Sequence, residues 1–215
     1  MMVSISRINK HHSTPIAKQS PSRSSGRSLD LVRKILFLLP LLIVCFVPSS
    51  VIAEPPFVLP PREEIMKLRS CQIFTNKGSI IFELYPQEAP WHVANFKYLA
   101  DRGFYRGLKF DYFQPDYIIQ IGKAPGGTPK DLRYSLQPEF SSQRHSYGAL
   151  GMSRISGSSN PQRRSHSTQF YIILGPAPHM NSSYTVFGRV IDGSEVLDSL
   201  RSGDVIEDLK VYVRD

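Results

Sequence analysis

Short apolar runs separated by turn residues recur along the chain from residue 71 to its end. The runs at 71–75 and 79–85 flank an Asn-Lys-Gly turn and predict a hairpin. In the second run Ile80, Phe82 and Leu84 fall on one face, as the two-residue period of a strand requires. A chain with many short strands and little helix is predicted to be mostly β, as a closed antiparallel barrel or a sandwich.

Further strands are predicted near residues 117–121, 149–152, 169–174, 185–191 and 205–213. Two helices are predicted, at 89–100 and 194–200, and Pro90 suits the first turn of the longer one. The polar stretches 123–147 and 153–167 are predicted as loops, which are common places for binding residues.

The first 53 residues differ from the rest in charge and hydropathy. They hold seven Lys or Arg and one acid, so most of the net charge of +8 lies there. The apolar run 35–47 and the small residues that follow, up to Ala53, match an export signal. The apolar stretch 35–53 has 19 residues, close to the roughly 20 that span a bilayer, so an uncleaved membrane anchor stays open.

These features divide the chain into an export signal or signal anchor (1–53), a proline-rich linker (54–66) and a folded domain (67–215). We expect an exported protein, located in a periplasm, in a lumen or outside the cell. Its only membrane contact would be an uncleaved leader. An organelle-targeting leader is the further alternative.

Charge and cysteine usage exclude several classes of protein. The part after residue 53 is nearly neutral, which gives it little attraction for a nucleic-acid backbone. Once the leader is removed, Cys71 is the one remaining thiol, so no internal disulfide can form. The histidines follow no paired metal-ligand spacing, and we expect neither a metal nor a cofactor. The charged residues Arg163 and Arg164 are interpreted as solvated surface.

Three segments, in a fixed order, carry a family resemblance. They are LKFDYFQPDYIIQ at 108–120, STQFYII at 167–173 and YTVFGRV at 184–190. Together they resemble the cyclophilin family of peptidyl-prolyl cis-trans isomerases, over about residues 71–213. The resemblance implies a cyclophilin-like closed eight-stranded antiparallel barrel capped by two helices. It also implies a monomer that binds proline-containing peptides or unfolded proteins.

The resemblance assigns roles to single residues. Gln120 matches a groove glutamine that holds the peptide backbone, and Tyr112 stands where the family has its catalytic arginine. The residues implied to bind substrate are Tyr117, Ile118, Ser153, Arg154, Gln169, Tyr171, Met180 and Tyr184. Two of the substitutions are notable, because Tyr184 replaces a frequent histidine and His179 replaces a tryptophan that is frequent in eukaryotic members.

The substitution at Tyr112 and the alternative of a membrane anchor at 35–53 leave three functions open. A neutral hydroxyl is a weaker donor than a guanidinium, so an isomerase would be slowed about ten- to a hundredfold unless another group, such as Arg154, replaces the donor. The second function is a non-catalytic proline-peptide-binding or chaperone module. The third is a membrane-tethered structural protein in which the barrel is only a scaffold.

Overall fold

The computed structural model describes residues 53–213 except 156, 158 and 159, so the predicted leader lies outside it apart from Ala53. Within this part, no helix has the length and apolar character needed to cross a membrane. The helices are α2 (Arg62–Ile65), α3 (Pro90–Asp101), α4 (Ser194–Ser199) and the 3-10 turns η1 (Lys130–Leu132) and η2 (Pro178–Met180). The strands are β1 (Leu68–Thr75), β2 (Gly78–Leu84), β3 (Tyr112–Gln114), β4 (Ile118–Ile121), β5 (Ser135–Leu136), β6 (Ala149–Arg154), β7 (Ser165–Ile173), β8 (Val186–Asp192) and β9 (Ile206–Val213).

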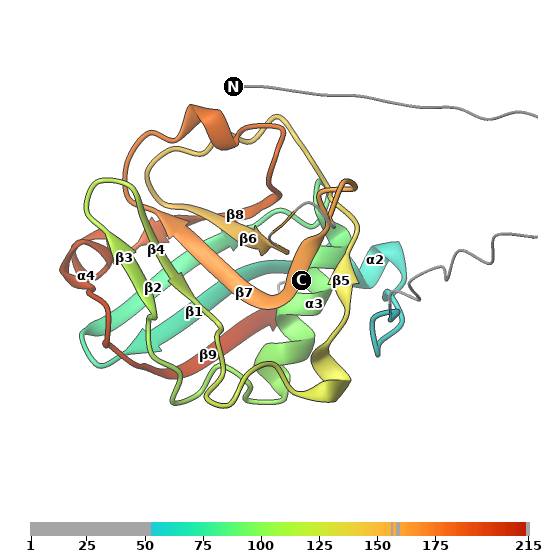
Figure 1. Cartoon of the computed structure of the whole chain (residues 1–215), viewed down its shortest axis with the longest axis horizontal. Coiled ribbons are helices and arrows are strands. Elements are labelled where there is room, and N and C mark those ends of the chain that lie inside the picture. Colours follow the sequence, from blue (N-terminus) through green and yellow to red (C-terminus); the bar gives the residue numbers. More distant parts are fainter. Residues whose placement is uncertain (1–52, 156, 158–159, 214–215) are drawn as a thin grey trace, which may run out of the picture. The chain divides into compact units, whose positions relative to one another are not determined.

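One antiparallel sheet runs through the described residues in the order β3-β4-β7-β6-β8-β2-β1-β9, with β5 paired to β7 beside this path (Figure 1). The sheet curls until the segments that enter its two edge strands meet. A bridge between Lys109 and Val205 joins them, and Phe110 N donates to Asp204 O at 2.9 Å. The predicted mostly β, eight-stranded antiparallel barrel is confirmed, with its edges joined by this short contact instead of a full strand pair.

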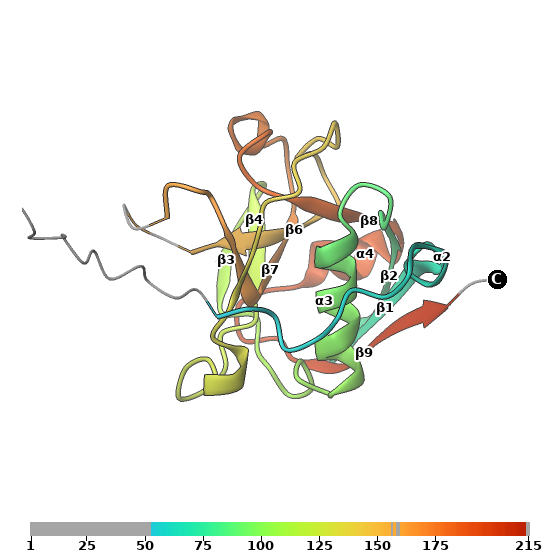
Figure 2. The ribbon, with the colours of Figure 1, turned by 90° about the vertical axis from the view of Figure 1, so that its right-hand side faces the viewer.

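The two predicted helices cover the sheet, α3 against β9 and β7, and α4 against β2 (Figure 2). The first turn of α3 has no capping side chain of its own. Instead, the carboxylate of Glu139 accepts hydrogen bonds from the backbone N–H groups of Trp91 and His92, at 3.1 and 3.0 Å. The His92 ring joins the same carboxylate, at 2.6 Å, to Ser165 Oγ, at 2.8 Å. This network fixes the start of β7 against the helix.

Strand alternation separates the main core from the outer face. On β7, Phe170 and Ile172 belong to the main core, whereas Tyr171 and Ile173 belong to a second, smaller cluster. On β4, Ile119 lies in the main core while its neighbour Ile118 lies in the second cluster. The two-residue period of these paired strands therefore places a set of rings and amides on the outer face.

The segment predicted as a proline-rich linker packs on the domain. The Phe57 ring lies 5.2 Å from the ring of Tyr98 and 5.9 Å from that of Trp91, between centroids. Ile65, in α2, is buried in the main core. The division of the chain into three ranges stays a prediction.

The structure adds elements that the pattern did not predict. Strands β3 and β5 and helix α2 are each four residues or shorter, too short to show a period. The interpretation of Arg164 as solvated surface is wrong, since only 8% of this residue is exposed. Its neighbour Arg163 is exposed, as expected.

Candidate functional site

All ten site residues predicted from the resemblance line one cavity of about 370 Å³. They come from four strands and from the loops that join them. The residues are Tyr112, Tyr117, Ile118, Gln120, Ser153, Arg154, Gln169, Tyr171, Met180 and Tyr184. We call this space the β4–β7 cavity. Their roles in binding and catalysis stay predictions, but the structure brings them together.

A single ring forms the base of the β4–β7 cavity. Tyr171 is 1% exposed, and its ring lies against Gly151 on the paired strand β6. A Cβ atom at Gly151 would lie only 2.4 Å from the ring, so this close approach requires glycine. The Tyr171 hydroxyl lies 2.9 Å from His145 Nε2, and burial raises the pKa of this tyrosine well above its ordinary value.

His145 connects the base of the cavity to one of its walls. Asn181 Oδ1 lies 2.9 Å from the backbone N of His145 and 3.0 Å from Nδ1. Because Oδ1 is an acceptor, Nδ1 carries the proton and Nε2 accepts a hydrogen bond from the Tyr171 hydroxyl. Burial lowers the pKa of His145, opposed by the Asn181 hydrogen bond. Asn181 follows the wall residue Met180, so one neutral imidazole ties Tyr171 to that wall.

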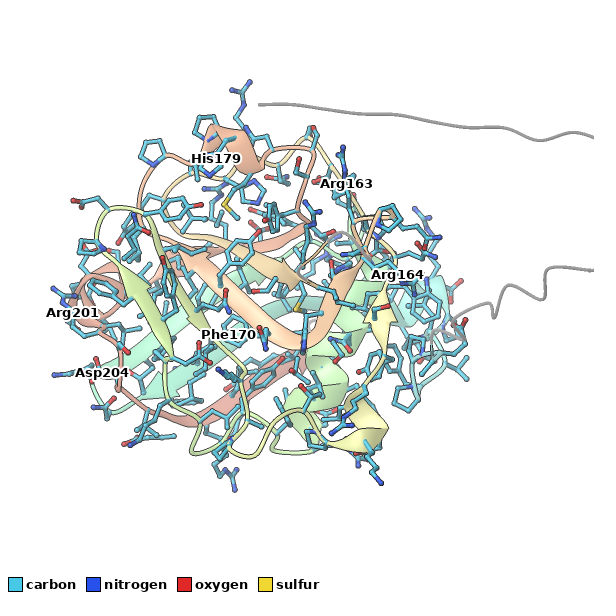
Figure 3. The ribbon with its side chains drawn as sticks, in the orientation of Figure 1. Arg163, Arg164, Phe170, His179, Arg201 and Asp204 are labelled. Carbon is cyan, nitrogen blue, oxygen red and sulfur yellow. The ribbon has the colours of Figure 1, made fainter. Side chains whose placement is uncertain are left out.

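Tyr117, His179 and Met180 form the rim. The Tyr117 hydroxyl lies 2.9 Å from His179 Nε2 and 3.4 Å from Met180 Sδ, and the two rings stack at 5.6 Å. Figure 3 places His179 on the η2 turn. On the opposite side Gln120 Nε2 donates to Gln169 Oε1 at 3.3 Å. That contact leaves Gln120 Oε1 and Gln169 Nε2 available to a peptide.

Tyr112 turns its hydroxyl to a neighbour on its own strand. The residue is 48% exposed, and its hydroxyl donates to Gln114 Oε1 at 2.9 Å. Its backbone lies opposite Gln120 in the β3–β4 register. A hydroxyl has one proton, so Tyr112 can donate into the cavity only after the bond to Gln114 breaks.

Arg154 is the charged residue of this lining within the described part of the chain. Its guanidinium lies over the Tyr184 ring, 5.0 Å from the centroid, and one NH group lies 3.5 Å from Ser183 O. The Arg154 Nε and the Ser153 Oγ are buried and have no protein partner among the described residues. Arg154 therefore brings a cation with an unsatisfied N–H donor to the lining, beside the Tyr184 ring.

Sequence reasoning missed the residues behind the lining. The sequence assigned no supporting role behind the lining to His145, Gly151 or Asn181. Each matters through a partner distant in the chain, as with His145 and Tyr171, 26 residues apart. Gly151 stands on a strand that was predicted, and a glycine inside a strand is a signal of close approach by another group.

The fold and this cavity define a class of protein, an antiparallel barrel with an outer cavity lined by aromatic rings and amides. Residues 70–214 match the family model described as cyclophilin type peptidyl-prolyl cis-trans isomerase/CLD. The chain belongs to this family of enzymes, and the predicted resemblance is confirmed.

Named relatives agree with the family model. Peptidyl-prolyl cis-trans isomerase B of Bacillus subtilis is 37% identical over 136 residues, which are 62% of this chain and 91% of that protein. A peptidyl-prolyl cis-trans isomerase of Helicobacter pylori is 33% identical over 151 residues, covering 68% of this chain and 88% of that protein. A crystal structure of a Cryptosporidium parvum cyclophilin in the presence of the dipeptide Ala-Pro has a TM-score of 0.58 and 28% identity, covering 67% of this chain and 99% of that one.

Proposed function

We propose that this chain is an exported prolyl isomerase that assists the folding of proline-containing proteins and is slowed by Tyr112. The observation that carries the proposal is the β4–β7 cavity, in which all ten predicted residues meet. Tyr117, Tyr171 and Met180 offer the apolar surface that a proline ring needs. Gln120 and Gln169 offer free amide groups to the flanking peptide backbone.

The reaction needs no nucleophile. The peptide bond resists rotation by roughly 18–20 kcal/mol because the nitrogen lone pair is delocalised into the carbonyl group. A catalyst must bind the twisted bond better than either planar form. A donor aimed at the imide nitrogen does this, since the lone pair of a twisted bond is localised and can accept a hydrogen bond.

We propose Arg154 as that donor in this chain. Its Nε has no protein partner among the described residues, and its guanidinium borders the cavity. The Tyr112 hydroxyl, in contrast, already donates to Gln114. A charged donor gives roughly twice the hydrogen-bond strength of a neutral one.

Proline-peptide isomerisation by the full-length chain tests both parts of the proposal. Tyr112→Arg should raise kcat/KM on the order of ten- to a hundredfold, because it adds a charged donor. The matched variant Tyr112→Phe should change little, since the lost hydroxyl is held by Gln114. Arg154→Gln should lower kcat/KM by about tenfold or more.

The second candidate is a non-catalytic proline-binding module, favoured by the hydrogen bond that occupies the Tyr112 hydroxyl. In that case peptides bind to the full-length chain, but the isomerisation rate equals the uncatalysed rate. Binding together with a measurable rate rejects this candidate.

Export rests on the leader sequence and has its own test. N-terminal sequencing of the mature protein should find Glu54 as the first residue. An intact Met1 would reject cleavage and favour the anchor over residues 35–53.

A further inference from the structure

A second cavity, of about 520 Å³, is lined by none of the ten predicted site residues. We call it the Arg164 cavity. Its lining includes Arg133, Ser135, Ile155, Asn160, Arg164 and His166. Within the described part of the chain, two arginines and neither Asp nor Glu line it.

Arg164 is almost buried and has no countercharge. Its Nε donates to Ser135 Oγ at 2.6 Å and one NH2 proton goes to Ser135 O at 2.8 Å, both of which are neutral acceptors. Among the described residues no carboxylate forms a salt bridge with it. A guanidinium has five N–H donors, so three remain. A buried cation without a partner favours an anionic ligand.

The backbone of Arg164 is held in place before any ligand binds. Asn160 Oδ1 accepts from Arg164 N at 2.8 Å, and Asn160 Nδ2 donates to Arg164 O at 2.9 Å. Ile155 N also donates to Arg164 O, at 3.2 Å. Arg163 has a left-handed φ of +56°, and beyond this turn Arg164 lies beside β5 (Figure 3). Little ordering entropy remains to be lost on binding.

Two more donors line the same space. His166 Nδ1 accepts from Thr168 N at 3.2 Å, so its proton lies on Nε2, which has no partner among the described residues. Arg133 is exposed, and its Nε donates to Thr128 O at 2.9 Å. The cavity therefore offers several N–H donors and positive charge to a ligand.

The Arg164 cavity and the β4–β7 cavity are both lined by residues of β7. Ile155, which directly follows β6, lines the former, and Arg154, the last residue of β6, lines the latter. On β7, Ser167 lines the former, whereas Gln169 and Tyr171 line the latter. From Ser167, these residues lie two and four positions along the strand, roughly 7 and 13 Å away at about 3.3 Å per residue. An extended peptide spans such distances with about two to four residues.

We propose that the Arg164 cavity binds a carboxylate side chain of the peptide whose proline lies in the β4–β7 cavity, about two to four residues from that proline. The inference rests on the proposed function and deepens it, because it makes the substrate an acidic proline peptide. Glu54 of this chain lines a smaller space of about 170 Å³ that also touches Arg164, but it forms no salt bridge with Arg164 among the described residues.

Affinity measurements with the full-length chain test this proposal. The probes are fluorescent peptides with one proline and a single Glu, moved through the four positions on each side, and matched peptides with Gln. At one position the Glu peptide should bind on the order of tenfold tighter than its Gln partner. The advantage should shrink at high salt, since it comes from charge.

Three variants locate the effect. Arg164→Gln should remove the preference for Glu, whereas Arg163→Gln, a change at the exposed neighbour, should keep it. Arg133→Gln changes an exposed residue at the same cavity and should reduce the preference, which keeps the test valid if Arg164→Gln fails to fold.

The outcomes separate this inference from the proposed function. Equal affinity of Glu and Gln peptides at every position overturns the inference but does not contradict the proposed function of the β4–β7 cavity. Failure of both peptide sets to bind overturns the proposed function and the inference with it. Inorganic phosphate that binds the chain, depends on Arg164 and is not displaced by any Glu peptide also overturns the inference, because the cavity would then hold a small anion.

Discussion

The β4–β7 cavity and the Arg164 cavity share strand β7, yet they differ in the side chains that line them. The first has a base of aromatic rings held by neutral hydrogen bonds, from Tyr171 through His145 to Asn181. The second surrounds a guanidinium whose hydrogen bonds to the described residues both go to Ser135. The polar groups at the base of the first cavity satisfy one another, whereas the second cavity leaves charged N–H donors for a ligand.

This difference predicts how each cavity recognises a ligand. Apolar contact area should supply most of the affinity of the β4–β7 cavity, and such contacts depend weakly on salt. Charge should supply the affinity of the Arg164 cavity, and it is weakened by salt. Changes in the first cavity should therefore alter binding of every proline peptide, whereas changes in the second should alter only the choice among them.

The largest effect is expected for Gly151→Ala. The new Cβ would lie 2.4 Å from the Tyr171 ring, which must move and close the β4–β7 cavity. Such overpacking destabilises a fold by about 1–3 kcal/mol, and we expect proline-peptide binding to be lost as well. Urea unfolding and peptide titration of the full-length chain measure the two effects.

Ser153→Ala on the same strand is the matched control. It removes a buried hydroxyl that has no partner among the described residues, so the free energy of unfolding should stay unchanged or rise. If Gly151→Ala bound peptides as the wild type does, the ring of Tyr171 would not be the base of the cavity.

Most of the fold could be predicted from the sequence because its elements repeat a period. The alternation on β2 and the helical stripe of α3 each appear over enough residues to be recognised. Strand β5 could not be predicted, because two residues carry no period. Its position depends on Arg164, which lies 29 residues away in the chain and donates to Ser135.

Some residues of the two cavities could likewise be predicted from the sequence, and others could not. The residues that line the β4–β7 cavity could be predicted because they stand in strings that resemble a family. The Arg164 side chain could not, because its burial depends on the left-handed turn at Arg163 and on the clamp from Asn160. Local sequence shows a polar basic loop, and the distinction between two adjacent arginines arises only from tertiary contacts.

A smaller effect, confined to binding, is expected for Tyr117→Ala. The loss of ring contact should weaken proline-peptide binding by about 1–3 kcal/mol. The hydroxyl bonds to His179 and Met180 are lost with it, but both partners lie at the rim. Calorimetric titration measures the change, which should be the same for Glu and Gln peptides. A loss limited to the Glu peptides would contradict the separation of the two cavities.

Gln120→Ala should weaken peptide binding less, on the order of 0.5–1.5 kcal/mol, because one exchangeable hydrogen bond is lost. The remaining amide of Gln169 loses its partner at 3.3 Å but can turn to the solvent. Arg163→Ala should change almost nothing, since its side chain is exposed. The same titrations rank the three variants, and the prediction fails if Arg163→Ala is the most damaging.

A modest effect is expected from pH, because protonation changes the charge of a side chain without removing the side chain. Burial lowers the pKa of His145 below its ordinary value of 6.5, and burial also lowers the pKa of His166. As the pH falls below about 6.5, the unfolded chain takes up protons that the folded chain resists. The contribution to the free energy of unfolding is therefore fully present above that pH and is lost as the pH drops towards the lowered pKa values.

Of the two histidines with lowered pKa, His145 lies behind the β4–β7 cavity and His166 lines the Arg164 cavity, so variants assign the pH effect. Urea midpoints at about pH 7.5 and about pH 5.5 should differ less in His145→Gln than in the wild type. The difference should also be smaller in His166→Gln, because each histidine contributes its own part of the pH dependence. Proline-peptide affinity should fall with pH in the wild type, because a protonated His145 can no longer accept from the Tyr171 hydroxyl. His166→Gln should keep this fall in affinity. The opposite result would be a loss of affinity at low pH that disappears in His166→Gln and persists in His145→Gln. That result would show that the hydrogen bond from Tyr171 to neutral His145 does not hold the base of the β4–β7 cavity.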